Sequence, residues 1–472
     1  MLLREPARPA VIRAHRLAPW FAVGTVCFGA FMGQLDASVV TVAFPALQRQ
    51  FGTGLAGVQW VSLGYLLALV ALLVPAGRWS DRVGRKLSYL FGFVVFAAAS
   101  AACGLASSLT MLIALRLLQA GGAALLQANS VALVVTSVPG PSRRAALGVQ
   151  AAAQAVGLAS GPVTGGLVIA AAGWRWIFLM NVPVGLIAVV AGWYLLPRTR
   201  QLAERRSADP AGMVLLAVSA AGTMLAISSL SGLGMPGWSV AGCAAAAVLA
   251  GAGLWWWERR AAAPLLDLRA LRTAGIAPAL GGALCAYLVL FGPLVLFPQV
   301  VSAEGGSALA AGLLLTSLPA GFGIAAVVSD RLLPARWPNR SRCAIGGWLA
   351  AGCAAALAVP APHAASVVLL GMLGAGLGVY TPANNAEIMA ALPSRDAATA
   401  GGMVNMTRGI GTALGVAVVT LGLHAGRNAG DPHAGPALAL AALSLAALAA
   451  AWAGLRVGQP GGAQAGEEDS RQ

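Results

Sequence analysis

Fourteen long apolar segments, separated by short polar connections, occupy almost the whole of this 472-residue chain. About 20 apolar residues are enough for an α-helix to cross the hydrocarbon core of a bilayer. Such helices satisfy their own backbone hydrogen bonds in lipid, and the segments are too long and too continuously apolar for barrel strands. We therefore expect an all-α polytopic membrane protein with 14 transmembrane helices, at Trp20–Phe44, Val58–Ala76, Leu87–Ser107, Leu109–Ser137, Ala145–Ala172, Trp176–Leu196, Met213–Ser231, Trp238–Trp257, Ile276–Val301, Leu309–Val328, Ala344–Val359, Ala364–Ala390, Ala398–Leu423 and Ala437–Leu455.

The distribution of basic residues predicts the orientation of these helices. Of the 30 Lys and Arg residues, only Arg49, Arg175 and Arg427 lie in one set of alternate connections, and Arg116 and Arg408 lie inside segments. The other 25 lie in the two terminal segments and in the remaining connections. Positive residues are retained on the cytoplasmic side, so both termini are expected to be cytoplasmic. The net charge of +15 then belongs to loops that face anionic lipid, and we expect no nucleic-acid partner.

The order of the segments indicates two six-helix bundles that flank an extra pair of helices. Ser80-Asp81-Arg82 follows the second segment, and Ser329-Asp330-Arg331 follows the second segment of the later half. Repeated halves are common in transporters. We expect a cytoplasmic N-terminal segment at 1–17, an N-terminal bundle at 18–197, and a linker with the inserted pair at 198–258. A C-terminal bundle with its preceding loop at 259–456 and a disordered cytoplasmic tail at 457–472 complete the chain.

The first predicted cytoplasmic hairpin carries a dense polar motif from Gly77 to Lys86. Gly77 allows helices to approach closely, Asp81 can cap a helix or pair with a cation, and the basic cluster can clamp neighbouring helix ends. An ordinary cytoplasmic loop would explain the basic residues but not an aspartate between two glycines. We interpret the motif as a conformational latch formed by Gly77, Asp81, Arg82, Gly84, Arg85 and Lys86.

The fifth segment has an unusual set of small residues. Glycines four residues apart favour close helix packing, and a proline removes a backbone hydrogen bond and allows a bend. The residues concerned are Gly157, Gly161, Pro162, Gly165 and Gly166.

Four ionisable residues inside the segments are candidates for proton coupling, because such residues are costly in a bilayer. Asp36 and Arg116 are predicted at depths that differ by about 3 Å, at a rise of 1.5 Å per residue. They can form either a titrating site or a static structural ion pair. Glu387 can be a second proton site or can reach the membrane interface. Arg408 can pair with Glu387 or serve a structural role.

Several of these motifs resemble those of the major facilitator superfamily and of its 14-helix drug:proton antiporters. The stretch Gly77–Lys86 resembles the signature loop of the superfamily, and Gly157–Gly166 resembles its exporter motif. Gln34–Pro45 is similar to the first helix of the antiporters. Arg116–Gly122 is similar to the arginine motif, with Ala120 where glycine is usual.

The resemblance implies a major facilitator fold and export of small lipophilic or cationic compounds, such as drugs and antibiotics. It further implies proton antiport, alternating access, a monomer and a multi-pass location in a bacterial inner membrane.

Two alternative functions come from different classes. A dedicated exporter of one metabolite, siderophore or amino acid has the same motifs. A membrane enzyme or receptor is disfavoured, because the four histidines are scattered and form no catalytic cluster with carboxylates. No residues are therefore assigned to catalysis. The six cysteines show no metal-ligand spacing, so no metal is expected. No nucleotide-binding loop is present, so we expect no cofactor and a proton gradient as the energy source.

Overall fold

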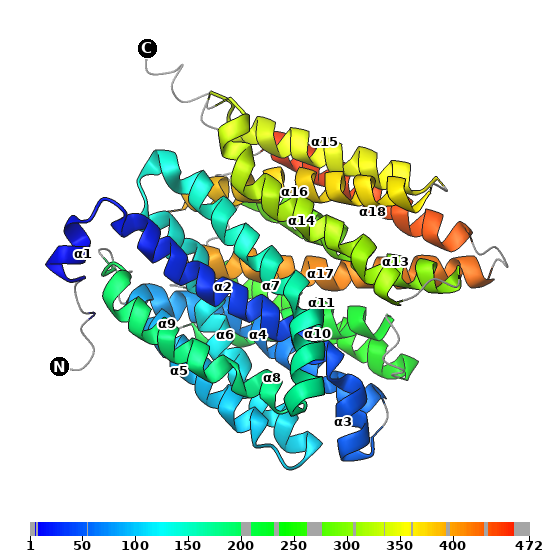
Figure 1. Ribbon diagram of the computed structural model, residues 1–472, viewed down its shortest axis with the longest axis horizontal. Coiled ribbons are helices and arrows are strands. Elements are labelled where there is room, and N and C mark those ends of the chain that lie inside the picture. Colours follow the sequence, from blue (N-terminus) through cyan, green and yellow to red (C-terminus); the bar gives the residue numbers. More distant parts are fainter. Residues whose placement is uncertain are drawn as a thin grey trace. The chain divides into compact units, whose positions relative to one another are not determined.

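The structure, a computed structural model, describes residues 5, 8–53, 55–199, 209–230, 236–261, 276–304, 308–334, 336–359, 362–392, 397–428 and 433–456. All regular elements in these ranges are helical (Figure 1). The chain divides into two compact units. The first unit contains Met1–Arg206 together with Ser394–Met406, and the second contains Ser207–Pro393 together with Thr407–Gln472.

The first unit contains the helices of the N-terminal half and the beginning of one helix from much later in the chain. The later helix is α17 (Ala397–Asn428), which starts in the first unit and continues in the second from Thr407. The other helices of the unit are α1 (Ala10–Ala14), α2 (Ala18–Val42), α3 (Phe44–Phe51), α4 (Leu55–Val83), α5 (Arg85–Gly104), α6 (Leu109–Ser137), the short 3-10 helix η1 (Gly140–Ser142), α7 (Arg143–Ala172), α8 (Trp176–Leu179) and α9 (Asn181–Leu195).

Packing in the first unit places α6 and α2 at the centre. The helix α6 packs against α5, α4 and α2, and α2 packs in addition against α7 and α9. At one end of α2, an apolar cluster of buried side chains from α2, α3, α4, α6 and α8 includes Leu47, Leu112 and Phe178. This arrangement brings the middle of α2 and the middle of α6 side by side, so polar side chains at those positions are shielded from solvent.

The second unit contains the remaining helices. Within it, α16 packs between α14 and α15, α18 packs against α15 and α13, and α10 packs with α11. The helices are α10 (Pro210–Leu230), α11 (Gly237–Glu258), α13 (Ile276–Ala303), α14 (Ala308–Leu332), α15 (Asn339–Leu357), α16 (His363–Ala391), the part of α17 from Thr407 and α18 (Ala434–Arg456).

Local sequence explains where the helices of the first unit end. Gly84 has a φ of +123°, which L side chains rarely adopt, and it separates α4 from α5 without a longer loop. Gly173, with a φ of +86°, follows the last residue of α7. Ser108 caps α6, because its hydroxyl accepts a hydrogen bond from the backbone N–H of Met111 at 3.2 Å.

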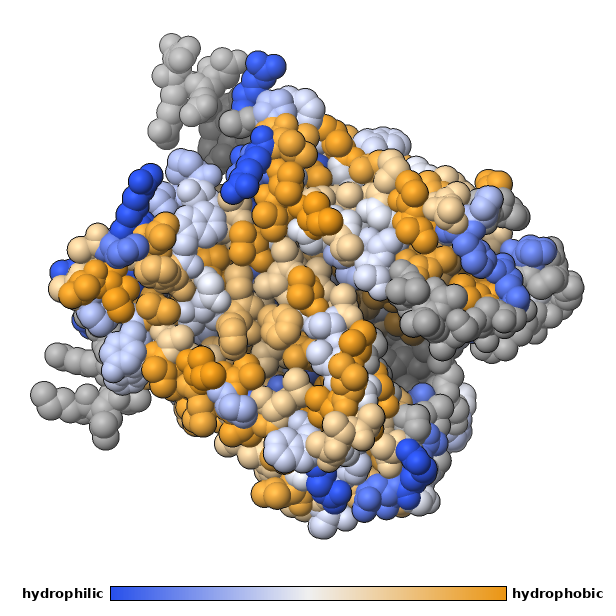
Figure 2. Space-filling model, viewed as in Figure 1, coloured by the Kyte–Doolittle hydropathy of each residue, from blue (hydrophilic) through white to orange (hydrophobic). Residues whose placement is uncertain are grey.

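The predicted apolar segments coincide with helices, with ends that differ by a few residues. The segment Trp176–Leu196 contains two helices, α8 and α9, but Met180 between them has an α-helical backbone. Ten helical stretches of the described residues, one of which is Trp176–Leu195, are long and apolar enough to cross a membrane, and eleven are if α7 counts as one bent span. The predicted number of fourteen transmembrane helices is therefore not confirmed. Large apolar side chains are exposed on many helices, and hydrophobic residues cover much of the face in Figure 2. The exterior is therefore suited to contact with lipid.

Candidate functional site

The ionisable pair predicted inside the first unit is formed. Arg116 on α6 donates from Nη1 to Oδ2 of Asp36 on α2, and the two atoms are 2.7 Å apart. Each residue is only 1% exposed. Two opposite charges therefore lie together in an environment without solvent, where each depends on the other for its electrostatic stabilisation.

Arg116 has further contacts that do not involve Asp36. Its Nε donates to the backbone oxygen of Val61 on α4 at 3.2 Å, and its Nη1 donates to Oε1 of Gln119 at 2.7 Å. Its guanidinium also lies 4.0 Å from the centre of the Tyr65 ring, a favourable cation–π geometry. The guanidinium is thus fixed to α4 and α6, and its position does not rest on the carboxylate alone.

Three polar residues that were not among the predicted site residues complete the environment of Asp36, and one of them, Gln119, lies in the arginine motif Arg116–Gly122. Gln119 donates from Nε2 to Oδ1 of Asp36 at 3.1 Å, and Asn181 on α9 donates from Nδ2 to the same oxygen at 2.9 Å. Ser100 on α5 accepts from both amides, at 2.7 Å from Gln119 and 3.4 Å from Asn181. The available signal was weak, namely polar residues inside apolar segments. Four helices therefore contribute side chains to one buried network.

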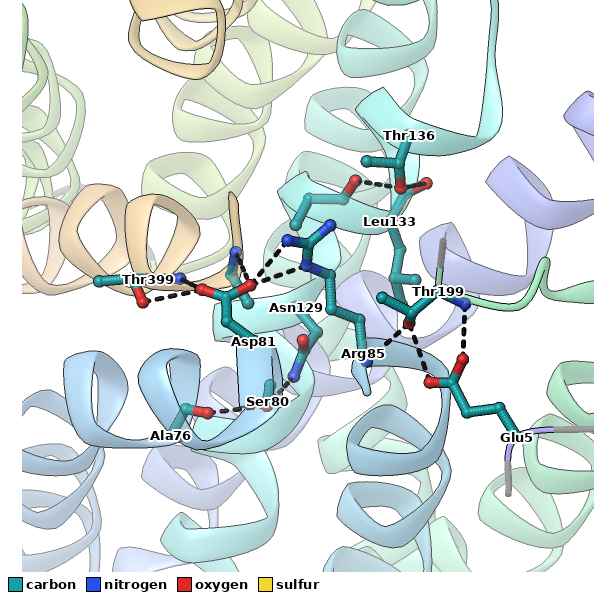
Figure 3. Close-up of polar contacts among 12 residues, drawn as sticks. Glu5, Ala76, Ser80, Asp81, Arg85, Asn129, Leu133, Thr136, Thr199 and Thr399 are labelled. Carbon is teal, nitrogen blue, oxygen red and sulfur yellow. Dashed lines mark hydrogen bonds and ion pairs between the residues drawn. The ribbon is translucent and has the colours of Figure 1, made fainter. Parts of the chain in front are cut away.

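The predicted latch is also assembled, around Asp81 at the end of α4 (Figure 3). The Asp81 carboxylate pairs with Arg85 at 2.8 Å. It accepts hydrogen bonds from the backbone N–H of Ala398 at 3.0 Å and of Thr399 at 2.8 Å, and from the Thr399 hydroxyl at 2.8 Å. The first amides of a helix have no partner within it, so the carboxylate caps α17 and complements its dipole.

Glycine at position 77 is required for this contact. A Cβ atom at Gly77 would collide with the backbone of Ala398 and Thr399. The glycine therefore allows α4 and the start of α17 to approach closely enough for Asp81 to reach the amides.

The basic residues of the motif have different positions. Lys86 is buried and donates from Nζ to the backbone oxygens of Trp193 at 2.7 Å and Leu196 at 3.0 Å, which neutralises the carbonyl end of α9. Arg82 lies in the last turn of α4 and is half-buried. The cluster therefore does clamp a neighbouring helix end, through Lys86.

A second acidic residue, absent from the sequence prediction, fixes the other side of the latch (Figure 3). Glu5 is 8% exposed and accepts hydrogen bonds from the backbone N–H of Thr199 at 2.5 Å, from the Thr199 hydroxyl at 2.9 Å and from the backbone N–H of Leu87 at 3.3 Å. The Thr199 hydroxyl also accepts from the backbone N–H of Arg85 at 2.9 Å. These contacts satisfy first-turn amides of α5.

The glycines of α7 face α2. Cβ atoms at Gly157, Gly161 and Gly165 would collide in turn with Phe31, Ser38 and Val39 of α2. Gly166 has open space beside it. The helix bends by 44° between Gly161 and Val163, where Pro162 lies. Three of the four predicted glycines thus set the distance between α7 and the helix that carries Asp36.

The two candidate residues of the second unit have other partners. Glu387, half-buried in α16, accepts a hydrogen bond from Nδ2 of Asn339 at 2.6 Å. The buried guanidinium of Arg408 lies 4.3 Å from the centre of the Tyr287 ring. Neither contact joins Glu387 to Arg408.

The second Ser-Asp-Arg repeat also forms an ion pair. Asp330, at the end of α14, pairs with Arg342 of α15 at 3.4 Å. Within the described ranges no group of three or more His, Cys, Asp or Glu side chains has a geometry that could hold a metal ion.

Comparison with known proteins identifies the family. Residues 26–416 match the Major Facilitator Superfamily. The chain is 32% identical over 426 residues to the tetracenomycin C resistance and export protein of Streptomyces glaucescens, a match that covers 88% of this chain and 77% of the relative. It is also 32% identical over 427 residues to the methylenomycin A resistance protein of Streptomyces coelicolor, with 89% and 88% covered.

Two further matches agree. The drug efflux pump JefA of Mycobacterium tuberculosis is 33% identical over 404 residues, with 82% of this chain and 77% of the pump covered. The crystal structure of the human organic anion transporter MFSD10 has the same fold, with a TM-score of 0.67, 16% identity, and coverage of 92% of this chain and 99% of that one. The chain therefore belongs to the major facilitator superfamily, as a multi-pass membrane transporter of small molecules and not an enzyme.

Proposed function

We propose that this transporter exports small lipophilic or cationic compounds in exchange for protons, by alternating access, and that Asp36 carries the exchanged proton. All fourteen predicted segments cross the plasma membrane of a bacterium in this proposal, with both termini in the cytoplasm. The proton gradient supplies the energy, and no cofactor takes part.

The observation that carries the proposal is the burial of Asp36 in the first unit. A carboxylate inside a membrane-spanning helix is expensive and is a functional candidate by default. Here it is 1% exposed, its charge is balanced by Arg116 at 2.7 Å, and its other oxygen is held by two amides. A purely structural pair could be replaced by apolar residues with little loss of stability, which gives no reason to retain it.

Protonation of Asp36 would change the balance of forces between α2 and α6. Neutralising one member of a buried ion pair leaves the other charge uncompensated, at a cost of about 3–5 kcal/mol. Arg116 retains Val61, Gln119 and the Tyr65 ring, so α4 and α6 hold the guanidinium while the attraction for α2 falls. A difference of this size is enough to move a two-state equilibrium by a factor of about 100 to 4,000, since about 1.4 kcal/mol corresponds to a factor of ten.

The latch provides the element whose state can change. Asp81 fixes the first turn of α17, and the remainder of that helix belongs to the second unit. Loss of these hydrogen bonds would free the start of α17 from α4. Breaking and remaking such contacts is one route by which transporters alternate between inward and outward access.

The substrate class rests on the relatives. Their names include resistance to or export of tetracenomycin C and methylenomycin A, and efflux of drugs. A second candidate, export of a single metabolite, is favoured by the relatives whose names give one compound, which include a riboflavin transporter and a probable actinorhodin transporter. The breadth of the substrate panel separates the two candidates.

The test uses inverted membrane vesicles with an acidified lumen. Ethidium, tetraphenylphosphonium, tetracenomycin C, methylenomycin A and riboflavin are added one at a time, and the pH gradient is followed with a fluorescent dye. Wild-type protein is expected to dissipate the gradient when at least one compound is added, and Asp36→Asn at matched expression is expected not to. Response to several unrelated compounds supports broad export, whereas response to one compound supports the dedicated exporter.

Glu387→Gln is the matched comparison, because it neutralises the other intramembrane acid predicted as a proton site. If Asp36→Asn exchanges protons like the wild type and Glu387→Gln does not, the coupling role belongs to Glu387 and the assignment to Asp36 is wrong. If no compound dissipates the gradient in wild-type vesicles that accumulate the same compounds, proton antiport itself is wrong.

A further inference from the structure

Asn181 is a buried polar residue inside the apolar stretch Trp176–Leu195. The helix α8 ends at Leu179, Met180 follows, and Asn181 is the first residue of α9. Its side chain is 2% exposed and points toward α2 and α5, where it contacts Asp36 and Ser100. A polar residue at this position in an apolar segment has no role in the proposed transport cycle described so far.

Ser100 fixes the direction of the Asn181 amide. One N–H of Asn181 Nδ2 is donated to Oδ1 of Asp36 at 2.9 Å, and the same nitrogen lies 3.4 Å from the Ser100 hydroxyl oxygen. Gln119 is held in the same way, with its Nε2 donating to Asp36 and to Ser100. Both amides therefore present nitrogen, not oxygen, to the carboxylate.

Every side chain that contacts Asp36 in this network is a donor. Oδ2 accepts from Arg116, and Oδ1 accepts from Gln119 and Asn181. This is a complete site for a carboxylate, which only accepts hydrogen bonds. A protonated Asp36 would carry an O–H that needs an acceptor, and an unmade hydrogen bond in a buried place is costly. Uptake of a proton must therefore be accompanied by a change of partner.

Asn181 is the partner best placed to change. Gln119 is held at its other end, because its Oε1 accepts from Arg116. The side-chain hydrogen bonds of Asn181 in the described part of the chain run only to Asp36 and Ser100. A half-turn of the Asn181 amide would bring its own oxygen to Asp36. It would move Nδ2 away from Ser100, whose hydroxyl can also donate, and would leave the hydrogen bonds of Arg116 and Gln119 in place.

We propose that Asn181, oriented by Ser100, is a positioning residue that holds Asp36 as a carboxylate and turns its amide over when Asp36 takes up a proton. The inference rests on the proposed function, in which Asp36 carries the exchanged proton. It gives Asn181, a buried amide in contact with Asp36, a role in proton uptake.

The ionisable groups on the helices around Asp36 fall into two sets. Those that interact with the carboxylate are Arg116, Tyr65 and Cys103. The others, on α2, on α5 and on the helices that pack on α2, are Arg13, Cys27, Arg49, Arg78, Asp81, Arg82, Arg85, Lys86, Tyr89, Arg143, Arg144 and Tyr194. The test variants leave both sets unchanged, so a change in pH dependence can be assigned to the amide.

The experiment measures protons released by purified protein when tetraphenylphosphonium, or whichever compound of the vesicle panel is transported, is added at a series of pH values. The readout is the pH at which release falls to half. Asn181→Leu removes one donor to the carboxylate and should move this midpoint to higher pH by about one unit. Asn181→Asp keeps the shape of the side chain but places a second carboxylate beside Asp36, and should move the midpoint further in the same direction.

Asn384→Leu is the matched control. Asn384 is 1% exposed in α16 of the second unit and donates to the backbone oxygen of Ala279, so its loss removes a buried amide without touching Asp36. Its midpoint should equal that of the wild type. Ser100→Ala, which frees the amide to turn, should show a smaller shift than Asn181→Leu.

The outcomes separate this inference from the proposed function. If Asp36→Asn still releases protons on addition of the compound, the proposed function is wrong. If Asp36→Asn releases none but Asn181→Leu and Asn181→Asp keep the wild-type midpoint, only the role of Asn181 is overturned. If Asn181→Leu does not fold, the isosteric Asn181→Asp decides alone, since an unshifted midpoint in that variant is enough to reject the inference.

Discussion

Replacement of Asp81 by alanine should release the first turn of α17, and the hydrogen bonds that are lost allow the increase in amide exchange to be calculated. The two amides concerned, of Ala398 and Thr399, lie in the first turn of the helix, where backbone N–H groups have no partner within it. A hydrogen bond to a charged acceptor contributes about 1.5–3 kcal/mol. Each factor of ten in an equilibrium corresponds to about 1.4 kcal/mol, so exchange of these two amides should rise about 10- to 100-fold.

Hydrogen–deuterium exchange followed by mass spectrometry measures this directly in detergent-solubilised protein, with peptides that cover the start of α17. Asp81→Asn keeps the shape of the side chain and one oxygen acceptor, so its increase should be smaller than that of Asp81→Ala. Asp81→Asn also avoids leaving Arg85 beside an empty space, which guards against loss of folding.

Ser80→Ala is the neighbouring control. The Ser80 hydroxyl contacts Ala76 and Asn129 in the same region, so its loss perturbs the end of α4 without removing a partner of α17. Exchange at Ala398 and Thr399 should remain as in the wild type. Equal exchange in Asp81→Ala and the wild type, in protein that retains its thermal stability, would refute the latch as described.

Three further predictions follow from the first unit. Gly161→Leu should lower the free energy of unfolding by about 1–3 kcal/mol through collision with Ser38, whereas Gly166→Leu, beside open space, should not, as measured by thermal unfolding. Gly84→Ala should also lower the free energy of unfolding by about 1–3 kcal/mol, because its φ of +123° is strained for alanine. Adding Glu5→Ala to the same chain should not restore stability, since it removes only the collision between the new Cβ and Glu5 and not the backbone strain. Arg116→Lys should slow proton-coupled exchange at least about tenfold despite its unchanged charge, because an ammonium cannot reproduce the guanidinium contacts to Val61 and Gln119; wild-type exchange rates in vesicles would contradict this.

The positions of the helices could be predicted from the sequence because a polar residue exposed to lipid is unfavourable wherever it lies, so each membrane helix must itself be apolar. Each apolar segment can be recognised without knowledge of the others. The pairing of Asp36 with Arg116 was predictable for a related reason, since depth in a membrane follows from position along a helix and few other charges were available. The structure places Nη1 of Arg116 2.7 Å from Oδ2 of Asp36.

The rest of the site depends on information that is not local. Asn181 reaches Asp36 because α9 packs against α2, and the sequence of the predicted segment Trp176–Leu196 does not reveal that packing. Ser100 could face lipid or the interior with equal ease on sequence grounds. Glu387 shows the same limit, because it accepts a hydrogen bond from Asn339, a residue that sequence position alone did not bring near it.

The contacts of the latch and of Arg116 share a property with consequences for how this family diverges. Asp81 accepts from the backbone nitrogens of Ala398 and Thr399. Lys86 donates to the backbone oxygens of Trp193 and Leu196, and Arg116 donates to that of Val61. The residue that supplies the side chain can therefore stay constant during evolution while the residue that supplies the backbone atom changes type. Correlated substitutions between the two positions should be weak, and a sequence motif would identify only the residue that supplies the side chain.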